Sequence, residues 1–198
     1  MPVTIGARRE SDFTDPLGML SDCHRRIERF LGVLERLASS RTGGSLSETE
    51  RSALSTSLQY FREAAPKHTA DEEESLFPRL RQAGGSEAGA LLERIAALES
   101  DHEYAVQAHA EVDMLGSKWL TCDSLSPEDA SRLDSLLREL SALYARHIAI
   151  EDGEVFPAAG RLISAQDRIE VGNEMAARRG VSVSGSFARA ALNDSGTK

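Results

Sequence analysis

The segment HTADEEESLFP, residues 68–78, recurs in altered form as HIAIEDGEVFP, residues 147–157. Both segments read H-x-x-x-E-x-x-x-x-F-P, so in each a histidine is followed four residues later by a glutamate. Residues four apart lie on one face of an α-helix, about one turn from each other. Each segment therefore predicts a helix that presents one imidazole and one carboxylate to the same point.

A further histidine precedes each repeated segment at a similar distance. His24 lies 44 residues before His68, and His102 lies 45 residues before His147. Both upstream histidines fall on apolar stripes with alternating steps of three and four residues, the pattern of an amphipathic helix. Each half of the chain thus predicts a helix with one histidine and then a helix with H-x-x-x-E. A repeated helix pair of this kind suggests a pseudo-twofold bundle.

Helix boundaries are marked by residues that cap helix N-termini. The third helix has only a weak start near Ser86, and Pro66 predicts a kink just before His68. The strong start signals are Asp15-Pro16, Ser47 with Glu50, Ser126-Pro127 with Asp129, and Ser164 with Asp167. Leu and Ala also far outnumber Ile and Val, which favours helix over sheet.

These signals predict an all-α fold: an antiparallel up-down-up-down four-helix bundle with an additional short C-terminal helix. We expect an N-terminal arm at 1–14, the bundle at 15–162, the additional helix at 163–180 and a flexible tail at 181–198. The additional helix ends in Arg178 and Arg179. We expect this basic end to be exposed, where it either meets a partner or favours the helix dipole.

Composition excludes several classes of protein. The net charge of −9 disfavours nucleic-acid binding, because phosphate contacts need clustered Lys and Arg. The two cysteines, Cys23 and Cys122, form no CxxC motif, so a disulfide framework or an iron–sulfur site held by cysteines alone is excluded. The chain has neither an apolar run long enough for a membrane span nor the apolar core of a signal peptide. We expect a cytoplasmic protein without membrane or nucleic-acid partners, and the oligomeric state stays open.

Four imidazoles and two carboxylates are therefore expected to converge inside an apolar bundle. A single histidine on an apolar face is usually a hydrogen-bonded core residue. Six such side chains repeated in two halves favour a metal site, because a cation offsets the cost of burying carboxylates. The predicted ligands are His24, His68, Glu72, His102, His147 and Glu151.

This order and spacing resemble the hemerythrin-like (HHE cation-binding) family over roughly residues 15–160. The resemblance implies a non-haem centre of two iron ions, completed by an oxo or hydroxo bridge. His24 and His68 would serve mainly one iron and His102 and His147 mainly the other, with Glu72 and Glu151 bridging the pair. The mixed nitrogen and oxygen ligands suit iron and do not exclude zinc or manganese.

The sequence departs from the family's oxygen carriers at one position. Those proteins have a further histidine one turn after the third, and Val106 stands there in this chain. The ligand count is more similar to di-iron proteins implicated in nitric-oxide response and iron–sulfur cluster repair. Those proteins often carry an N-terminal cysteine-containing segment, which this chain lacks.

Three hypotheses for function follow. The first is a protein that binds or senses O₂ or a related small oxidant, nitric oxide or peroxide, because no second catalytic constellation occurs. The second is a di-iron enzyme or iron donor in nitric-oxide or peroxide stress and iron–sulfur cluster repair. The third is a structural role, with zinc or with no metal. Each of the first two implies a small diatomic or peroxide ligand.

Other residues near the predicted ligands have simpler interpretations. His109 lies about 10 Å along the helix from His102 and is interpreted as a core or supporting histidine. Glu28 is expected at the surface or rim, and Cys23 as a small buried apolar residue. We expect the three tyrosines to pack in the core, although a phenol could donate to a bound oxygen species. These tyrosines are Tyr60, Tyr104 and Tyr144.

The acidic run beside Glu72 is expected to be a solvated face that could guide cations inward. It comprises Asp71, Glu73 and Glu74. The two Phe-Pro pairs that end the repeated segments, at 77–78 and 156–157, are expected to plug the end of the bundle.

Overall fold

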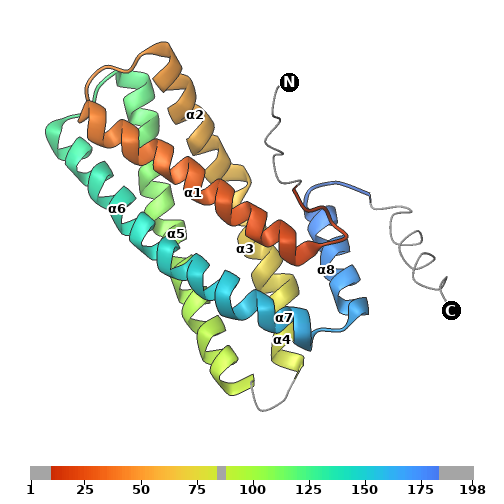
Figure 1. Cartoon of the computed structure of the whole chain (residues 1–198). Coiled ribbons are helices and arrows are strands. Elements are labelled where there is room, and N and C mark those ends of the chain that lie inside the picture. The colour runs from red at the N-terminus through yellow and green to blue at the C-terminus, as the bar shows by residue number, and fades with distance from the viewer. Residues whose placement is uncertain (1–9, 84–87, 183–198) are drawn as a thin grey trace, which may run out of the picture.

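Figure 1 shows a computed structural model of the chain, which describes residues 10–83 and 88–182. Those residues are almost entirely helical and contain no strand. The elements are α1 Pro16–Arg41, α2 Glu48–Glu63, α3 Ala65–Ala70, η1 Asp71–Leu76, α4 Phe77–Gln82, α5 Ala88–Cys122, α6 Pro127–Ile150, η2 Glu151–Val155, α7 Phe156–Leu162 and α8 Ala165–Arg178. The all-helical prediction is confirmed.

Four helical runs pack side by side in a ring (Figure 1). Helix α1 packs against α2 and α6, and α5 packs against the same two helices. The second run continues from α2 through α3, η1 and α4, and the fourth continues from α6 through η2 and α7.

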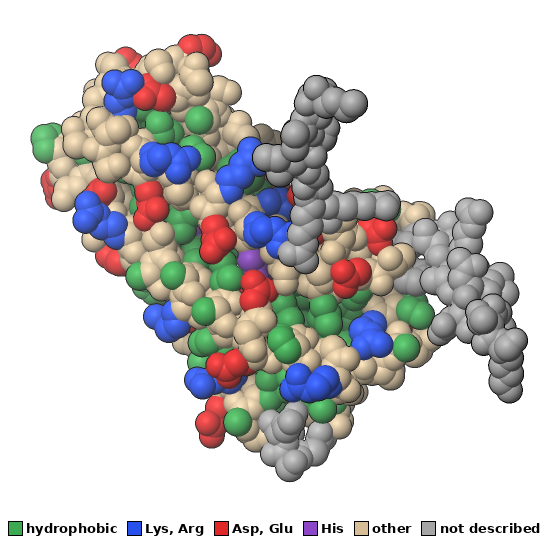
Figure 2. Space-filling view, in the orientation of Figure 1, with side chains coloured by type: hydrophobic (Ala, Val, Ile, Leu, Met, Phe, Trp, Pro, Cys, Tyr) green, Lys and Arg blue, Asp and Glu red, His purple; other side chains and the backbone are tan. Residues whose placement is uncertain are grey.

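Acidic and basic side chains are interspersed over the face of the molecule shown in Figure 2.

The capping residues found in the sequence form the helix starts. Asp15 accepts a hydrogen bond from the Gly18 amide, and Ser126 accepts one from Asp129. Ser47 with Glu50, and Ser164 with Asp167, form reciprocal capping boxes. Each cap satisfies an amide that lacks a partner within its helix. The weak start near Ser86 lies outside the described residues.

Prolines interrupt the second and fourth runs. Pro66 is the second residue of α3, and the helix breaks at Ala64 just before it, as expected. Pro78 and Pro157 follow short π-helical turns, in which Phe77 and Phe156 donate to the carbonyls of Glu72 and Glu151, five residues earlier. A proline ring lacks an N–H and clashes with the carbonyl four residues before it, which accounts for the widened turns. Both π turns begin at or beside the glutamate of the repeat.

The apolar core is divided into two clusters with a polar layer between them. On α1, Leu20 belongs to one cluster and Ile27 to the other, with His24 between them. On α5, Leu98 and Ala105 flank His102 in the same way. In the second and fourth helical runs, the ligands likewise lie between residues of the two clusters: Phe61 and Leu76 in the second, Tyr144 and Val155 in the fourth. All six predicted ligands therefore occupy one layer across the middle of the bundle.

The ends of the chain are described only in part. The arm residues 10–14 are described, and the amide of Ser11 donates to the buried carboxylate of Asp22 at 2.6 Å. The predicted tail lies outside the described residues except for Val181 and Ser182. Within the described part, no helix is both long and apolar enough to cross a membrane.

Candidate metal centre

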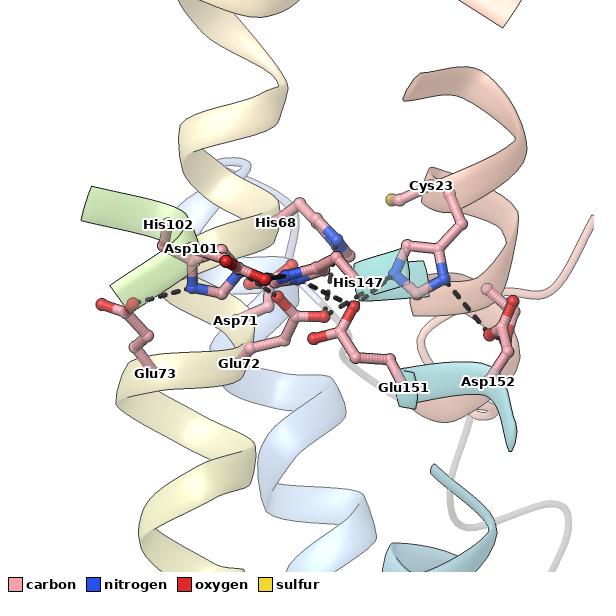
Figure 3. A network of polar contacts seen from close by, with 12 residues as sticks. Cys23, His68, Asp71, Glu72, Glu73, Asp101, His102, His147, Glu151 and Asp152 are labelled. Atoms are coloured by element: carbon pink, nitrogen blue, oxygen red, sulfur yellow. Dashed lines mark hydrogen bonds and ion pairs between the residues drawn. The ribbon is translucent and has the colours of Figure 1, made fainter. Parts of the chain in front are cut away.

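The two repeated glutamates lie between imidazoles from different helices. His24 Nε2 and His147 Nε2 approach the same oxygen of Glu151, at 3.0 and 3.2 Å. Glu72 Oε1 lies 3.4 Å from His68 Nε2, and its Oε2 lies 3.5 Å from His102 Nε2. Figure 3 shows five of these side chains turned toward one another: His68, Glu72, His102, His147 and Glu151. The structure brings all six predicted residues together, and all six are buried.

The ligand atoms fall into two overlapping groups. In the first, atoms of His24, His68, Glu72 and Glu151 lie within 4.8 Å of one another. In the second, His102 and His147 share Glu151 at the same spacing. This division matches the expected pairing of the histidines, and each glutamate contacts an imidazole of both groups.

Carboxylates outside the layer hold the other nitrogen of three histidines. Asp152 Oδ1 lies 3.2 Å from Nδ1 of His24, and Glu73 Oε1 lies 2.8 Å from Nδ1 of His102. An outer carboxylate of this kind fixes the tautomer and orientation of a metal-ligating imidazole, with its Nε2 turned inward. The interpretation of Glu73 as part of a solvated face is wrong, because it reaches back to His102 from the start of the π turn.

The third outer carboxylate is Asp101, whose Oδ2 lies 3.4 Å from Nδ1 of His147. The sequence reasoning missed Asp101 and Asp152. A signal was present, since each is the chain neighbour of a predicted ligand, His102 or Glu151.

The outer contacts follow the repeat but are not complete. Glu73 and Asp152, each directly after a repeated glutamate, hold the lone upstream histidine of the opposite half. Asp101 holds His147, but its counterpart before His24 is Cys23, and Nδ1 of His68 has no hydrogen-bond partner among the described residues. The group containing His68 is therefore less well oriented than the group containing His147.

The surroundings shift the pKa values of the two carboxyl groups in opposite directions. Burial and the neighbouring charge of Glu151 hold the pKa of Glu72 well above its ordinary value. Burial also acts to raise the pKa of Glu151, but hydrogen bonds from His147 and His24 outweigh it and lower that pKa. Two close carboxylates favour sharing one proton unless a cation supplies positive charge.

The imidazoles respond in opposite ways to the same surroundings. Burial opposes a charge on His24, but hydrogen bonds with Asp152 and Glu151 raise its pKa to about 9. Burial and the positive charge of His24 lower the pKa of His68 well below its ordinary value. A neutral His68 has a free nitrogen lone pair, the form in which imidazole binds a metal.

Unpaired buried atoms test whether a metal fits this layer. Apart from their contacts with the imidazoles of this layer, His24 Nε2 and the four carboxylate oxygens of Glu72 and Glu151 have no hydrogen-bond partner among the described residues. Buried polar atoms are normally satisfied, and leaving a carboxylate unpaired costs several kcal/mol. Because these atoms face one another and are all metal-donor types, the residues fit a bound cation.

Comparison with known proteins identifies the fold family. A family model described as the hemerythrin HHE cation-binding domain matches residues 15–159. The chain belongs to this family. An uncharacterised protein of Haemophilus influenzae is 29% identical over 170 residues, which cover 85% of this chain and 92% of that protein. The chain is thus a hemerythrin-like domain whose buried His/Glu cluster could bind metal.

A cavity of about 240 Å³ adjoins the cluster of this hemerythrin domain. Its wall includes the four clustered histidines and continues along α5 to Asp113. His109 also lines it, with Nε2 2.9 Å from the hydroxyl of Tyr144. His109 belongs to neither ligand group. Val106 is 61% exposed on the cavity wall and belongs to neither ligand group.

The remaining interpretations have mixed outcomes. Cys23 is buried and Glu28 is exposed, as expected. Tyr144 is buried, but the expectation of core packing is wrong for Tyr104, which is 43% exposed and donates to Glu139. Phe156 does more than fill the bundle end, because its ring stacks on His24 with centroids 5.3 Å apart.

The basic end of α8 is not an exposed feature. Asp71 is fully buried and accepts hydrogen bonds from Arg178 at 2.9 Å and from Arg179 at 2.6 Å. Arg178 also donates to Glu74 and to the hydroxyl of Ser75. The expectations of a solvated Asp71 and an exposed basic end are both wrong, because the two charges pair. This pairing fastens α8 to the π turn that carries Glu72.

Proposed function

We propose that this protein holds two iron ions in the buried layer and binds O₂ or a related small oxidant, nitric oxide or peroxide, there. The observation that carries the proposal is the position of the two glutamates. Each lies between Nε2 atoms of imidazoles from two helices, and none of the carboxylate oxygens has another partner among the described residues.

In this proposal His24 and His68 would hold one iron, and His102 and His147 would hold the other. Glu72 and Glu151 would bridge the two ions and neutralise part of their charge. Bound iron would supply reversible exchange between the ferrous and ferric states. The four helical runs form an antiparallel up-down-up-down bundle in this proposal, which the short connections at 42–47 and 123–126 favour.

The chain's own side chains have three tasks at this site. Asp152, Glu73 and Asp101 orient three of the imidazoles through Nδ1. The two apolar clusters exclude water from either side of the layer. The cavity gives a small molecule a path to the imidazoles, so the site can exchange a ligand with solvent.

The test is anaerobic loading with ferrous iron, followed by metal analysis and absorption spectra under reduction, in air and with nitric oxide. We expect two irons per chain and spectra that change with each gas. Glu72→Ala and Glu151→Ala should each lose most of the metal. Glu154→Ala is the matched control, since Glu154 is exposed and pairs with Arg94 outside the layer. A chain that holds no iron, or a Glu72→Ala variant that keeps both ions, contradicts the proposal.

A second candidate, turnover or iron donation in the nitric-oxide or peroxide stress response, is favoured by the same open cavity, because an exchangeable site can release a product. Consumption of peroxide or nitric oxide above the background of His68→Ala would support an enzyme. Transfer of iron to an apo iron–sulfur protein would support a donor. Loading with zinc or manganese in parallel tests which metal the donor set prefers.

A further inference from the structure

The structure points to a second ligand for this protein. We propose that the cavity beside the His/Glu layer binds a small, neutral, largely apolar organic molecule with one oxygen function, of the size and type of phenol. The proposal goes beyond the proposed function, because it needs no metal. It rests on the part of the cavity wall that lies beyond the His/Glu layer, on the side of Phe61 and Val112.

The first argument is size. A water molecule occupies about 30 Å³ in the liquid, and a diatomic gas is of the same order, whereas a dry cavity of about 150 Å³ is large enough to bind benzene. This cavity has about 240 Å³. Its wall runs from His102 to Asp113 on α5, roughly 16 Å along the helix axis. The space is larger than the metals and a diatomic ligand require.

The second argument is the polarity of the wall. Away from the layer it is formed by side chains such as Ile27, Leu58, Phe61 and Val112. The charged residues on this part of the wall, Arg62 and Asp113, pair with each other at 2.6 Å. A charged guest would lose water without gaining a partner in this part of the cavity, so a neutral guest is favoured.

The third argument is a polar pair with one hydrogen to spare. Burial lowers the pKa of His109 to about 4, and burial raises the pKa of Tyr144 above its ordinary value, so both are neutral near pH 7. The neutral pair carries one N–H and one O–H hydrogen and uses one of them between Nε2 and the hydroxyl. The other hydrogen can be donated to a guest.

The tautomer of His109 decides which hydrogen is free. Nδ1 is sealed from solvent and has no partner among the described residues, so a hydrogen on it would not reach a guest. The proposal therefore takes Nε2 as the donor to Tyr144, which leaves the tyrosine O–H for the guest. Phe61 stacks on His109 with ring centroids 4.2 Å apart and holds the imidazole in place. An apolar guest with one oxygen acceptor matches a single fixed donor in an apolar wall.

The cavity has an entrance between α3 and α5. Pro66 lies on one side of it, and Val106 and Ala110 lie on the other; all three line the cavity and are exposed. A large side chain at Val106 would obstruct this entrance without replacing a buried residue. Met114, two turns along the same helix, is 60% exposed and does not line the cavity. It offers a matched control.

The test uses 4-fluorophenol as the probe, with ¹⁹F NMR titration and calorimetry on the full chain, both metal-free and iron-loaded. We expect saturable 1:1 binding in both forms. Fluorobenzene should bind more weakly and 4-fluorobenzoate more weakly still. Val106→Trp should weaken 4-fluorophenol binding at least tenfold, while Met114→Trp leaves it unchanged. Tyr144→Phe should weaken 4-fluorophenol by about 3- to 10-fold, the effect of one lost hydrogen bond, and change fluorobenzene little.

The proposal is overturned by a lack of saturable binding, by equal effects of Val106→Trp and Met114→Trp, or by tighter binding of 4-fluorobenzoate than of 4-fluorophenol. Binding that appears only in iron-loaded protein, with a new visible absorption band, also overturns it, because the probe is then a metal ligand. Metal analysis of the same samples keeps the two proposals apart. A chain that takes up no iron but binds 4-fluorophenol contradicts only the proposed function.

Discussion

The substitution Asp71→Asn tests whether α8 is fastened to the bundle by a buried ion pair. Asp71 has 0% of its surface exposed, and its two partners, Arg178 and Arg179, have side chains only 19% and 20% exposed. Asparagine keeps the shape of the side chain but removes its charge. It also turns one oxygen into an NH₂ group, which then faces a guanidinium that is itself a donor.

The expected effect is about 3 kcal/mol off the free energy of unfolding, because breaking a buried pair leaves an uncompensated charge worth 3–5 kcal/mol and the two arginines retain some solvent. Arg178 keeps Glu74 as a partner, which also limits the loss. The matched control is Asp134→Asn. Asp134 pairs with Arg138, which is 73% exposed, so this variant should lose less than about 0.5 kcal/mol.

The assay is urea unfolding of metal-free protein, followed by circular dichroism, at low and at high salt. Screening reaches exposed pairs more than buried ones, so the loss for Asp71→Asn should persist at high salt. Hydrogen exchange should show faster opening of α8 in the same variant. If Asp71→Asn and Asp134→Asn destabilise the protein equally, the buried pair does not hold α8 in place.

Four further predictions concern the layer and its cavity. Because burial lowers the pKa of His109 to about 4, its own contribution to stability falls by about 2 kcal/mol between pH 7 and pH 5, where the unfolded chain binds a proton that the folded chain does not; urea titrations of metal-free protein at each pH should show the stability difference between wild type and His109→Phe shifting by that amount. Asp152→Ala should weaken metal binding by about 10- to 100-fold in chelator competition, while Glu154→Ala should not. Metal titration should show two unequal steps, since His68 lacks an outer carboxylate, and Asp101→Ala should bring the steps together; one step in wild type would refute this. A chelator should lower the unfolding midpoint, by about 2.7 kcal/mol in stability if metal had been present at a hundred times its Kd, and an unchanged midpoint would favour a site without metal.

The six clustered residues could be predicted because helical periodicity converts spacing into direction. His24 and His102 interrupt apolar stripes, and a polar residue on a buried stripe must face the interior whatever the details of packing. The i, i+4 step places Glu72 and Glu151 one turn from their histidines in the same way. Capping residues such as Ser47 and Ser164 work through hydrogen bonds to nearby amides, so their consequences are also local and readable.

What could not be predicted depends on contacts between helices. Asp71 and Glu74 stand in one acidic run, yet Asp71 is buried under α8 while Glu74 stays exposed. The difference arises because Asp71 starts the π turn on the side where α8 packs, and no periodicity in the run itself encodes that packing. The basic end of α8 was misjudged for the same reason, since a pair separated by more than 100 residues looks like two unrelated surface charges.

The carboxylates that contact Nδ1 of the histidines could have been predicted in part. Aligning the two halves of the repeat gives the positions of these residues, although not their contacts. Aligning the halves sets Glu73 against Asp152, and the structure shows that each supports the lone histidine of the opposite half. The same alignment sets Asp101 against Cys23, where the carboxylate is missing and His68 is left without an outer partner. The two halves are therefore alike in the residues that face each other across the layer and unlike in the residues behind them. The sequence already contains this difference, because an aspartate precedes His102 and a cysteine precedes His24. Of the two, only the aspartate accepts a hydrogen bond from the histidine of the following helical run.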